Sequence, residues 1–408
     1  MPFELRAISE DEHPEFHVVE GSAFGHVPTS GDQLAEDRTV TEYDRTIAVF
    51  DDGRIVATAC AYSFEMTVPG GAAVPVAAVS AVSVAGTHRR QGLLTQMMQH
   101  QLDDVVARGE SMAVLNASEA GIYGRFGYGL AQFFQTWQFD TIRSTFALPV
   151  RDDLRLRMVP KGEAQPVLAP IYDAWRRSRP GALTQSDAWW RCVLSDNTDW
   201  RGGGKLLIVV CEPTDEHAGG YASYVVERDD EPPGRWKMTV RELVSADDDV
   251  RARLWRFLLD VDLIGTVEVE AVAMDDPLRW YLHDPRQLQT IAVRDFLFVR
   301  IVDIPAALVA RSYEADGDLV LAVDDPFRPV TSGSYRITAS AGAATCARTD
   351  APADLALDVA DLGAIYLGGV TATELARAGR ITEHRPGALT EADRLFKSSV
   401  APFCITRF

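Results

Sequence analysis

The stretch "VSVAGTHRRQGLLTQMM" at residues 82–98 decides the fold, because a strand pattern, a basic turn and a helix pattern follow one another there. An apolar run predicts a strand at 73–84, and apolar residues at i, i+3 and i+4 spacing predict a helix at 91–108. Helix N-termini present unpaired N–H groups and a positive dipole end, and a glycine such as Gly92 lets the backbone approach a ligand. The turn is therefore typical of a pyrophosphate-binding site.

Arg89 and Arg90 add positive charge to this turn. Its spacing differs from the GxxxxGK[ST] of P-loops and from the GxGxxG of dinucleotide-binding folds. By itself the turn leaves a second interpretation open, in which the arginines only form the basic cap of a structural helix. The neighbouring segments have to decide between the two interpretations.

The chain repeats one order of elements, which is three strands, a helix and a further strand. The first set is predicted at 46–50, 54–68, 73–84, 91–108 and 112–118, and the second at 205–212, 219–228, 236–245, 247–262 and 266–272. This repetition indicates an internal duplication of one fold. From residue 295 onward, strands alternate with a few helices, which indicates a small α+β domain.

Composition excludes several classes of protein. The 408 residues are 47% hydrophobic, which is ordinary for a globular protein, and the net charge is −19. That charge repels nucleic acid and anionic membranes and favours cationic substrates such as amines. No apolar run is long enough to span a bilayer and the N-terminus is polar, so we expect a cytoplasmic protein. The five cysteines are widely spaced without CxxC, so we expect neither a disulfide framework nor a bound metal.

A glycine-rich stretch follows the fourth strand of the first set. The segment "GIYGRFGYG" at 121–129 contains too many glycines for a regular helix, and it offers two tyrosines, Tyr123 and Tyr128. A phenol with a pKa of ~10 is protonated at neutral pH and can donate a proton. The residues alone do not say which tyrosine has this role, or whether either one is simply packed in a core.

Arg-x-x-Gly between an apolar strand and an amphipathic helix resembles the acetyl-CoA signature of the GNAT acetyltransferases, although Leu94 stands where the signature usually has a small residue. Four segments together resemble the enhanced intracellular survival (Eis) family of acetyltransferases. They are "SVAGTHRRQGLL", "ASEAGIYGRFGYG", "RTDAPADLALDVADLGAIYLGG" and the C-terminal Phe. They lie in the same order as in that family, and the resemblance covers nearly the whole chain.

The resemblance implies an α/β (α+β) chain with two tandem GNAT folds, each a mixed sheet flanked by helices, and a C-terminal domain similar to sterol carrier proteins. The expected domains are a catalytic GNAT domain at 1–150, a GNAT-like domain without cofactor at 151–294 and the sterol carrier-like domain at 295–408. It also implies a homohexamer built as a dimer of trimers. The second domain's matching turn, "VSADDDVRARLW" at 244–255, has three aspartates and no glycine, so it would repel an anionic cofactor.

The resemblance also implies roles for individual residues. Tyr123 matches the family's general acid, and the C-terminal carboxylate of Phe408 matches its general base. Backbone groups of the strand would pair with the pantetheine arm of acetyl-CoA and polarise the thioester. The residues expected to bind acetyl-CoA are Val82, Ser83, Val84, Arg89, Arg90, Gln91, Gly92, Leu93, Leu94, Thr95, Ser118 and Glu119.

The chain ends in "SSVAPFCITRF" at 398–408, which is unusually apolar for a terminus. A free α-carboxylate with a pKa of ~3.3–3.7 is a weak base, and burial would strengthen it. Without the resemblance, Phe408 reads as an aromatic anchor for a last strand. Two residues depart from the relatives that acetylate aminoglycosides. Arg407 would repel a polycation, and Ala81 is small where those relatives tend to have an aromatic residue.

These observations predict an N-acetyltransferase that moves an acetyl group from acetyl-CoA to an amine by direct attack on the thioester. The acceptor would be an aminoglycoside-like molecule or a Lys side chain, with no nucleic acid or membrane partner. Two alternatives stay open. One is a lipid- or sterol-binding protein that uses the third domain, and the other is a catalytically idle GNAT scaffold.

Overall fold

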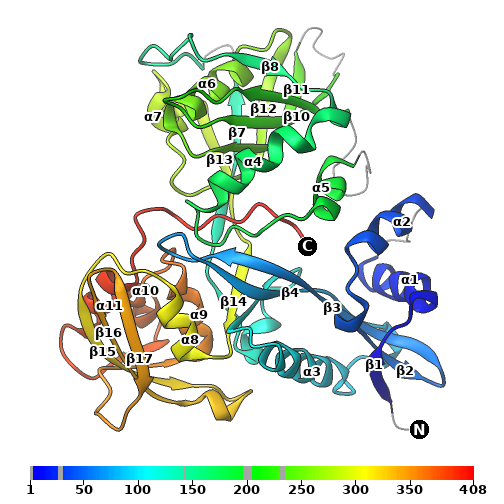
Figure 1. Cartoon of the computed structure of the whole chain (residues 1–408), viewed down its shortest axis with the longest axis vertical. Coiled ribbons are helices and arrows are strands. Elements are labelled where there is room, and N and C mark those ends of the chain that lie inside the picture. Colours follow the sequence, from blue (N-terminus) through cyan, green and yellow to red (C-terminus); the bar gives the residue numbers. More distant parts are fainter. Residues whose placement is uncertain (1–2, 26–30, 142–143, 196–204, 229–234) are drawn as a thin grey trace. The chain divides into compact units, whose positions relative to one another are not determined.

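A computed structural model describes the chain except for residues 1–2, 26–30, 142–143, 196–204 and 229–234 (Figure 1). The described residues form two compact units. The first unit comprises residues 1–132, 296–399 and 406–408, and the second comprises residues 133–295 and 400–405. Among the described residues, no helix is both long enough and apolar enough to cross a membrane.

The first unit contains a mixed sheet in the strand order β1-β2-β3-β4-β5-β14-β6. Strands β1 to β4 form an antiparallel meander, and β4 is parallel to β5 because helix α3 crosses over between them. The strands are β1 (Glu4–Ala7), β2 (Thr46–Asp51), β3 (Arg54–Thr67), β4 (Ala73–Val84), β5 (Met112–Asn116), β6 (Gly129–Leu130) and β14 (Leu297–Ile301). The predicted helix is confirmed as α3 (Leu93–Ala107).

Two helical layers cover this sheet. Helix α3 contributes Leu93 and Met97 to a core cluster on one face. Helix α1 (His13–Phe24) contributes Phe16 to a cluster that includes Cys60 and Tyr62 of β3. Because side chains alternate along a strand, odd-numbered and even-numbered residues around Ala61 on β3 face different layers. Helix α2 (Gly31–Val40) follows α1.

The second unit repeats this architecture, which confirms the predicted duplication. Its sheet has the order β13-β7-β12-β11-β10-β9-β8, with β11 parallel to β12 after the crossover helix α6 (Asp248–Leu259). The strands are β7 (Phe133–Asp140), β8 (Leu156–Met158), β9 (Leu207–Cys211), β10 (Gly220–Glu227), β11 (Trp236–Ser245), β12 (Ile264–Val272) and β13 (Leu288–Asp295). The other helices are α4 (Gln165–Arg176), α5 (Asp187–Leu194) and α7 (Leu278–Tyr281).

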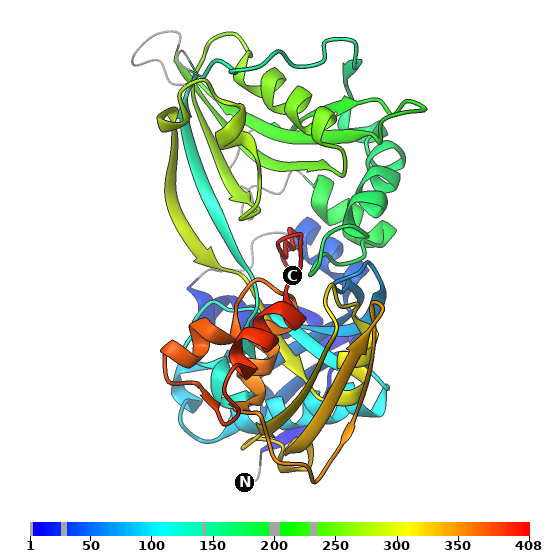
Figure 2. The same ribbon diagram turned by 90° about the vertical axis from the view of Figure 1, so that its left-hand side faces the viewer.

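Two strands lie in a different sheet from the one that the expected domain boundaries would give them. Strand β7 precedes residue 150 but pairs with β12 and β13 in the second sheet, and Figure 2 shows β7 and β13 as long neighbouring strands. Strand β14 follows residue 295 but pairs with β5 and β6 in the first sheet. The hydrophobic pattern of a strand does not say in which sheet it pairs. The placement of β7 in the second sheet and of β14 in the first could therefore not be predicted from the sequence.

The third domain adds a five-stranded sheet in the order β17-β16-β15-β18-β19. Every residue of α9 (Val359–Tyr366) is buried. Gly129 and Gly363 bring α9 against β6 and β14, since a Cβ at either glycine would collide with the backbone of Ala360 or Val299. The remaining elements are β15 (Gly317–Asp324), β16 (Gly333–Ser340), β17 (Ala343–Arg348), β18 (Leu355–Asp358), β19 (Ile381–Glu383), α8 (Ile304–Ala310), α10 (Ala372–Arg377) and α11 (Ala388–Phe396).

Candidate active site

Strands β4 and β5 separate where β4 approaches the basic turn. Their parallel pairing runs only from Val76 opposite Met112 to Val79 opposite Leu115. Beyond Val79, β4 continues to Val84, so its edge toward β5 is open. A chain-like ligand could form strand-type hydrogen bonds with that edge.

A bulge in β4 marks the start of this open edge. Against β3 the register steps from Cys60 opposite Ser80 to Thr58 opposite Ser83, so β4 carries one additional residue. Ala81 in this bulge has a φ of 51°, which is the left-handed region that non-glycine residues rarely adopt. Bulges of this kind turn backbone groups away from their neighbours. Sequence reasoning missed the bulge because Ala81 carries no glycine or proline signal.

The predicted cofactor residues on β4 offer mainly their backbone. Val82 and Val84 are half-buried and pack on the core beneath α3. The Ser83 side chain is buried, and its Oγ lies 2.7 Å from the Thr58 hydroxyl, which also donates to the Ala81 carbonyl. The Ser83 hydroxyl is therefore engaged within the protein, and its backbone is what remains for a ligand.

The N-terminus of α3 forms an exposed anion cradle. Gly92 is the N-cap residue with a φ of 84°, and the first helical bond runs from the Gln96 N–H to the Gly92 carbonyl. The three preceding helical N–H groups, those of Leu93, Leu94 and Thr95, therefore have no intrahelical partner. Such groups bind phosphate well, because the helix dipole adds to their hydrogen bonds.

The predicted basic residues surround this cradle. Arg89, Arg90 and Gln91 are exposed. Arg90 has a φ of 65°, which is a strained left-handed conformation for a residue other than glycine, and such strain is often found at functional sites. The Leu93 side chain points into the core, so only its backbone can serve a cofactor. Leu94 is half-buried and packs on the same core, which explains why a larger residue fits where the signature has a small one.

Tyr123 begins a short 3₁₀ turn, Tyr123–Phe126, just beyond the end of β5. Burial, with a smaller contribution from nearby Glu119, raises the pKa of Tyr123 to about 12. Its hydroxyl has no hydrogen-bond partner among the residues that the structure describes. It is therefore a protonated donor with no competing acceptor. Ser118 and Glu119 are exposed in the loop before it.

Tyr128 differs from Tyr123 although their ring centroids are only 6.0 Å apart. Tyr128 is 2% exposed, and its hydroxyl is shielded from solvent without a partner among the described residues. Burial raises the pKa of Tyr128 above its usual range. The structure thus favours Tyr123 as the residue able to reach a ligand.

The C-terminal segment brings Phe408 to β3. The Phe408 ring lies 6.1 Å from the ring of Phe64, between centroids. Tyr123 belongs to the core cluster that includes Ala61, three residues earlier on β3. Ala61 and Phe64 face different layers, so these two contacts place Tyr123 and Phe408 against opposite faces of the same part of β3. Residues 397–408 form neither helix nor strand, so the expected last strand is absent, while the ring contact with Phe64 is also what an aromatic anchor would make.

A group of carboxylates lines the same layer as Phe64, and sequence reasoning missed it. His17 Nδ1 lies 3.2 Å from Glu20 and 3.9 Å from Asp37. Burial raises the pKa of Asp37 to about 6, and Glu20 adds to this effect. The ring centroid of Tyr62 lies 6.5 Å from that of Phe64. Burial raises the pKa of Tyr62, and the negative charges of nearby Glu20 and Asp37 raise it further.

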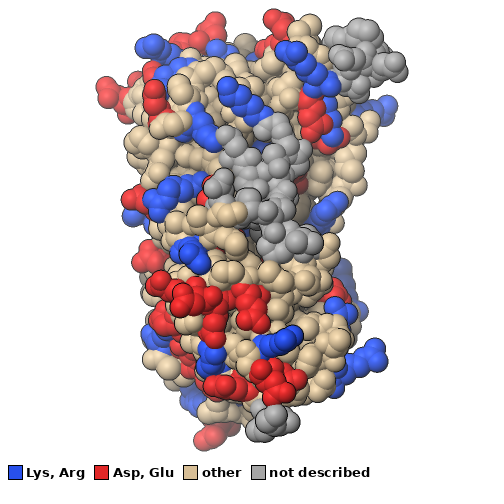
Figure 3. Space-filling view, turned by 90° about the vertical axis from the view of Figure 1, so that its right-hand side faces the viewer, with Lys and Arg blue, Asp and Glu red and all other residues tan. Residues whose placement is uncertain are grey.

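The two carboxylates, Glu20 and Asp37, come from α1 and α2. The only sequence signal was the spacing of His13, His17 and Glu20, which places three polar side chains along one helix. Glu10, Asp11 and Glu15, at the start of α1 and just before it, are exposed. Acidic side chains also gather on the lower part of the face that Figure 3 shows. This part of the first unit therefore favours a cation.

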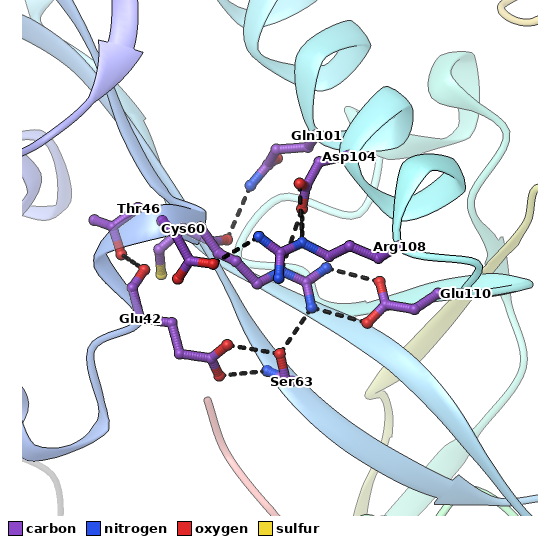
Figure 4. A network of polar contacts seen from close by, with 10 residues as sticks. Glu42, Thr46, Cys60, Ser63, Gln101, Asp104, Arg108 and Glu110 are labelled. Carbon is purple, nitrogen blue, oxygen red and sulfur yellow. Dashed lines mark hydrogen bonds and ion pairs between the residues drawn. The ribbon is translucent and has the colours of Figure 1, made fainter.

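A buried polar network holds β3 in place beside Phe64 (Figure 4). Arg45 is 3% exposed and donates to both oxygens of Glu110, at 2.8 and 2.7 Å, and to the Ser63 hydroxyl at 2.9 Å. Glu42 accepts from the Ser63 N–H and hydroxyl, both at 2.6 Å. Gln101 of α3 donates to the Cys60 carbonyl at 2.9 Å. Breaking such a buried ion pair leaves an uncompensated charge, so the network fixes the local geometry strongly.

The matching turn of the second unit is built differently. Asp247 is the N-cap of α6, and its side chain accepts from the Val250 N–H at 3.0 Å. His217 Nδ1 lies 2.9 Å from Asp247, and Asp249 lies beside them. These three form a His/acid group among the described residues, but Asp247 already serves the helix. Nothing about the group calls for a metal.

Comparisons with known proteins agree with this fold. Models of the acetyltransferase (GNAT) domain match residues 4–131 and 181–301, and a model of the sterol carrier protein domain matches residues 304–405. An uncharacterized N-acetyltransferase of Streptomyces avermitilis is 41% identical over 405 residues, which is 99% of both chains. The chain is thus a tandem GNAT acyltransferase with a sterol carrier-like domain.

Two further relatives define the family. The N-acetyltransferase Eis of Mycobacterium tuberculosis is 31% identical over 411 residues and matches 98% of both chains. The crystal structure of Eis1 from Mycobacterium abscessus shares 32% identity and a TM-score of 0.88, with complete coverage of both chains. The chain belongs to the Eis-like family of N-acetyltransferases, which confirms the family and the enzyme class expected from the sequence.

Proposed function

We propose that this enzyme transfers the acetyl group of acetyl-CoA to an amine, which attacks the thioester directly. One observation carries the proposal. The edge of β4 is open beyond Val79, the uncapped N-terminus of α3 follows that strand, and Tyr123 packs in the core cluster that contains Val79 and Leu115, the last paired residues of β4 and β5. GNAT enzymes use acetyl-CoA, and these three features supply what its arm, its pyrophosphate and its sulfur each need.

Acetyl-CoA would bind mainly through the backbone. The N–H groups of Leu93, Leu94 and Thr95 would hold the pyrophosphate, with Arg89 and Arg90 adding charge. The pantetheine arm would pair with the open edge at 82–84, and a backbone N–H there would polarise the thioester carbonyl. Gln91, Ser118 and Glu119 would contact the rest of the cofactor.

Tyr123 and Phe408 would handle protons. The α-carboxylate of Phe408 would accept a proton from the amine, so that a neutral nitrogen attacks the carbonyl carbon. As the carbon–sulfur bond breaks, the Tyr123 hydroxyl would donate to the developing thiolate. Because the pKa of Tyr123 is about 12, its proton is present at every working pH.

The acceptor is expected to be cationic when it arrives. Glu20 and Asp37 lie near Tyr62, beside the Phe64 and Phe408 pair, and would attract an ammonium group. An aminoglycoside-like molecule and a Lys side chain both meet this requirement. Arg407 is exposed and opposes a highly charged polycation, so a small or singly charged amine fits best.

The enzyme is further proposed to work in the cytoplasm as a homohexamer, a dimer of trimers, without nucleic acid or membrane. Light scattering of the purified chain measures that assembly directly. The alternative of a lipid carrier has less support, because α9 buries all of its residues and has no free face for a lipid. An idle scaffold has less support because the α3 cradle and Tyr123 are intact.

Thiol release from acetyl-CoA, measured with a panel of amines, tests the activity. Release that depends on an amine supports the proposal, whereas acetyl-CoA binding without release supports the scaffold. The role of Phe408 has its own test. A short C-terminal extension removes the carboxylate from its place and should reduce turnover to background, while the same extension at the N-terminus should not. A fully active C-terminally extended enzyme would refute the role of Phe408.

A further inference from the structure

The final segment belongs to both units in turn. Helix α11 ends at Phe396, and no described residue after it lies in a helix or strand. Residues up to Ser399 belong to the first unit, residues 400–405 to the second, and residues 406–408 to the first again. A segment without secondary structure has large conformational entropy, so specific contacts must fix its path.

Two charged residues of the second unit hold Ala401. Asp275 accepts from the Ala401 N–H at 2.9 Å, and Arg179 Nη1 donates to the Ala401 carbonyl at 3.2 Å. The same Nη1 donates to both Asp275 oxygens, at 2.7 and 2.8 Å. Both hydrogen-bonding groups of one tail residue are therefore taken by a single ion pair.

The structure keeps this ion pair at a cost. The Arg179 side chain is 13% exposed, and its Nε is buried without a partner among the described residues. An unsatisfied buried donor destabilises a fold, so each one in a native structure asks for an explanation. Holding the backbone of the tail is the function that its contacts show.

Phe403 lines a small pocket of the second unit, together with apolar residues and the charged Arg179, Arg251 and Asp276. It is 5% exposed, its N–H donates to the Pro180 carbonyl at 2.8 Å, and its ring meets Trp175 edge-on at 6.3 Å between centroids. The pocket is also lined by Trp255 of α6 and Leu243 of β11. Residues of β12 complete it, where β11 and β12 have stopped pairing.

This pocket matches the cofactor region of the first unit in its position within the fold. In both units the two parallel strands separate and the crossover helix begins nearby. In the first unit that place is an open edge, whereas in the second the chain's own Phe403 contributes to it. The second domain thus retains the GNAT cleft and uses it for its own C-terminal segment.

We propose that the cofactor-free GNAT-like domain anchors the C-terminal segment, so that Phe408 presents its carboxylate in one fixed position. Arg179, Asp275 and the Phe403 pocket are positioning residues, which touch neither acetyl group nor amine. The proposal rests on the proposed role of Phe408 as the base. An anchored carboxylate reacts faster than a mobile one, because the entropy of placing it is already lost before the amine binds.

Steady-state kinetics of the full-length enzyme with three changes at the anchor test this. Phe403→Ala should lower kcat by about 10–100-fold, in line with the cost of a small misplacement of a catalytic group. Phe403→Leu keeps an apolar side chain and should stay within about threefold of the unchanged enzyme. Asp275→Asn keeps the shape but not the charge and should fall between the two. The KM for acetyl-CoA should not change in any of them.

Two controls separate positioning from general damage. Trp280→Ala removes an aromatic side chain of the same unit that is 80% exposed, and it should leave kcat unchanged. A chain that ends at Arg407 carries its α-carboxylate one residue short of the proposed position. Adding Phe403→Ala to that chain should cost less than about twofold more, since effects of residues that act as a unit are not additive. The decrease in kcat at low pH that comes from protonating the Phe408 carboxylate should be absent from the chain that ends at Arg407, with or without Phe403→Ala.

Each result has one meaning. If the chain ending at Arg407 is slow but Phe403→Ala is as fast as the unchanged enzyme, the anchor is refuted and the role of Phe408 survives. If Phe403→Ala slows the shortened chain as much as the complete one, the effect is structural and the anchor is again refuted. If the chain ending at Arg407 turns over normally, the role of Phe408 and the anchor both fail.

Discussion

The turn between β4 and α3 and the turn between β11 and α6 occupy the same position in two copies of one fold, yet they carry opposite charge. The first presents Arg89, Arg90 and a glycine N-cap, so the helical N–H groups stay available. The second presents Asp247, whose own carboxylate takes the Val250 N–H. The same backbone therefore becomes an anion site or a closed helix end, depending on a few residues.

The comparison extends to the cleft beside each turn. In the first unit the edge of β4 is open beyond Val79. In the second the matching place contains Phe403 from the chain's own end. The second copy has a capped helix end and a pocket lined by Phe403 at this place, and we propose that it positions the C-terminal segment for the active site of the other copy.

Removing the proposed acid is the severest test of which copy is catalytic. Tyr123→Phe should lower kcat by ~10²–10⁴ with little change in acetyl-CoA affinity, because the phenyl ring keeps the packing. The matched control is Tyr128→Phe, which removes a buried hydroxyl that has no partner among the described residues and should cost nothing. Stopped-flow thiol release measures both. Equal rates for the two variants would take the acid role away from Tyr123.

Giving the turn between β4 and α3 the negative charge of the turn between β11 and α6 should weaken its binding of acetyl-CoA. Arg90→Asp should raise the KM for acetyl-CoA by roughly 10–100-fold, the size expected when one charge-assisted contact is lost. Aspartate tolerates the left-handed backbone at this position, so the fold should persist. Arg377→Asp on the exposed surface of α10 is the control for net charge. An unchanged KM would mean that the arginine only caps the helix.

The amine acceptor should also bind to the first GNAT domain, and the pH dependence of its KM tests this. Because the pKa of Asp37 is about 6, this carboxyl loses its charge as the pH falls from 7 to 5, and the KM for a cationic amine should rise several-fold. Asp37→Asn should raise KM at pH 7 and flatten its pH dependence. Since the folded-state pKa lies above the ordinary value, ionising Asp37 costs stability, so this group's contribution is lost as the pH rises through 6. A KM that is independent of pH in the unchanged enzyme would exclude Asp37 from acceptor binding.

The smallest effect is expected at the second turn. Asp247→Ala removes the N-cap of α6 and should lower the free energy of unfolding by ~1 kcal/mol, with kcat and both KM values unchanged. Asp247→Ser restores a capping hydroxyl and should recover most of the loss. Thermal unfolding and thiol release measure the two properties on the same samples. A loss of activity without a loss of stability would show that the second turn is not merely structural.

Local signals in the sequence were sufficient for most of the elements and for the helix N-terminus that forms the candidate cofactor site. Helix α3, the strands around it and the repeat in the second unit follow from hydrophobic spacing and turn residues, because these are properties of neighbouring positions. The cradle at Gly92 followed because helix N-termini bind anions wherever they occur. The choice of Tyr123 over Tyr128 needed the family resemblance, since both are tyrosines in one glycine-rich loop.

Contacts between distant segments were beyond the sequence. The exchange of β7 and β14 between sheets depends on which open edge each strand meets. The bulge at Ala81 follows from register against β3. The grouping of Glu20 and Asp37 near Tyr62 depends on how α1 and α2 pack on that strand. None of these leaves a signal in the spacing of nearby residues.

The sequence by itself determined that this chain has one basic and one acidic copy of a phosphate-type turn, and therefore one candidate cofactor site. Charge and helix-end chemistry are local, so they can be read from a few consecutive letters. Only the tertiary structure decided what the apolar end of the chain does. It showed Ala401 and Phe403 fixed in the second unit and Phe408 against Phe64 in the first. Such a path is set by packing between residues far apart in the chain, and packing is a property of the folded molecule alone.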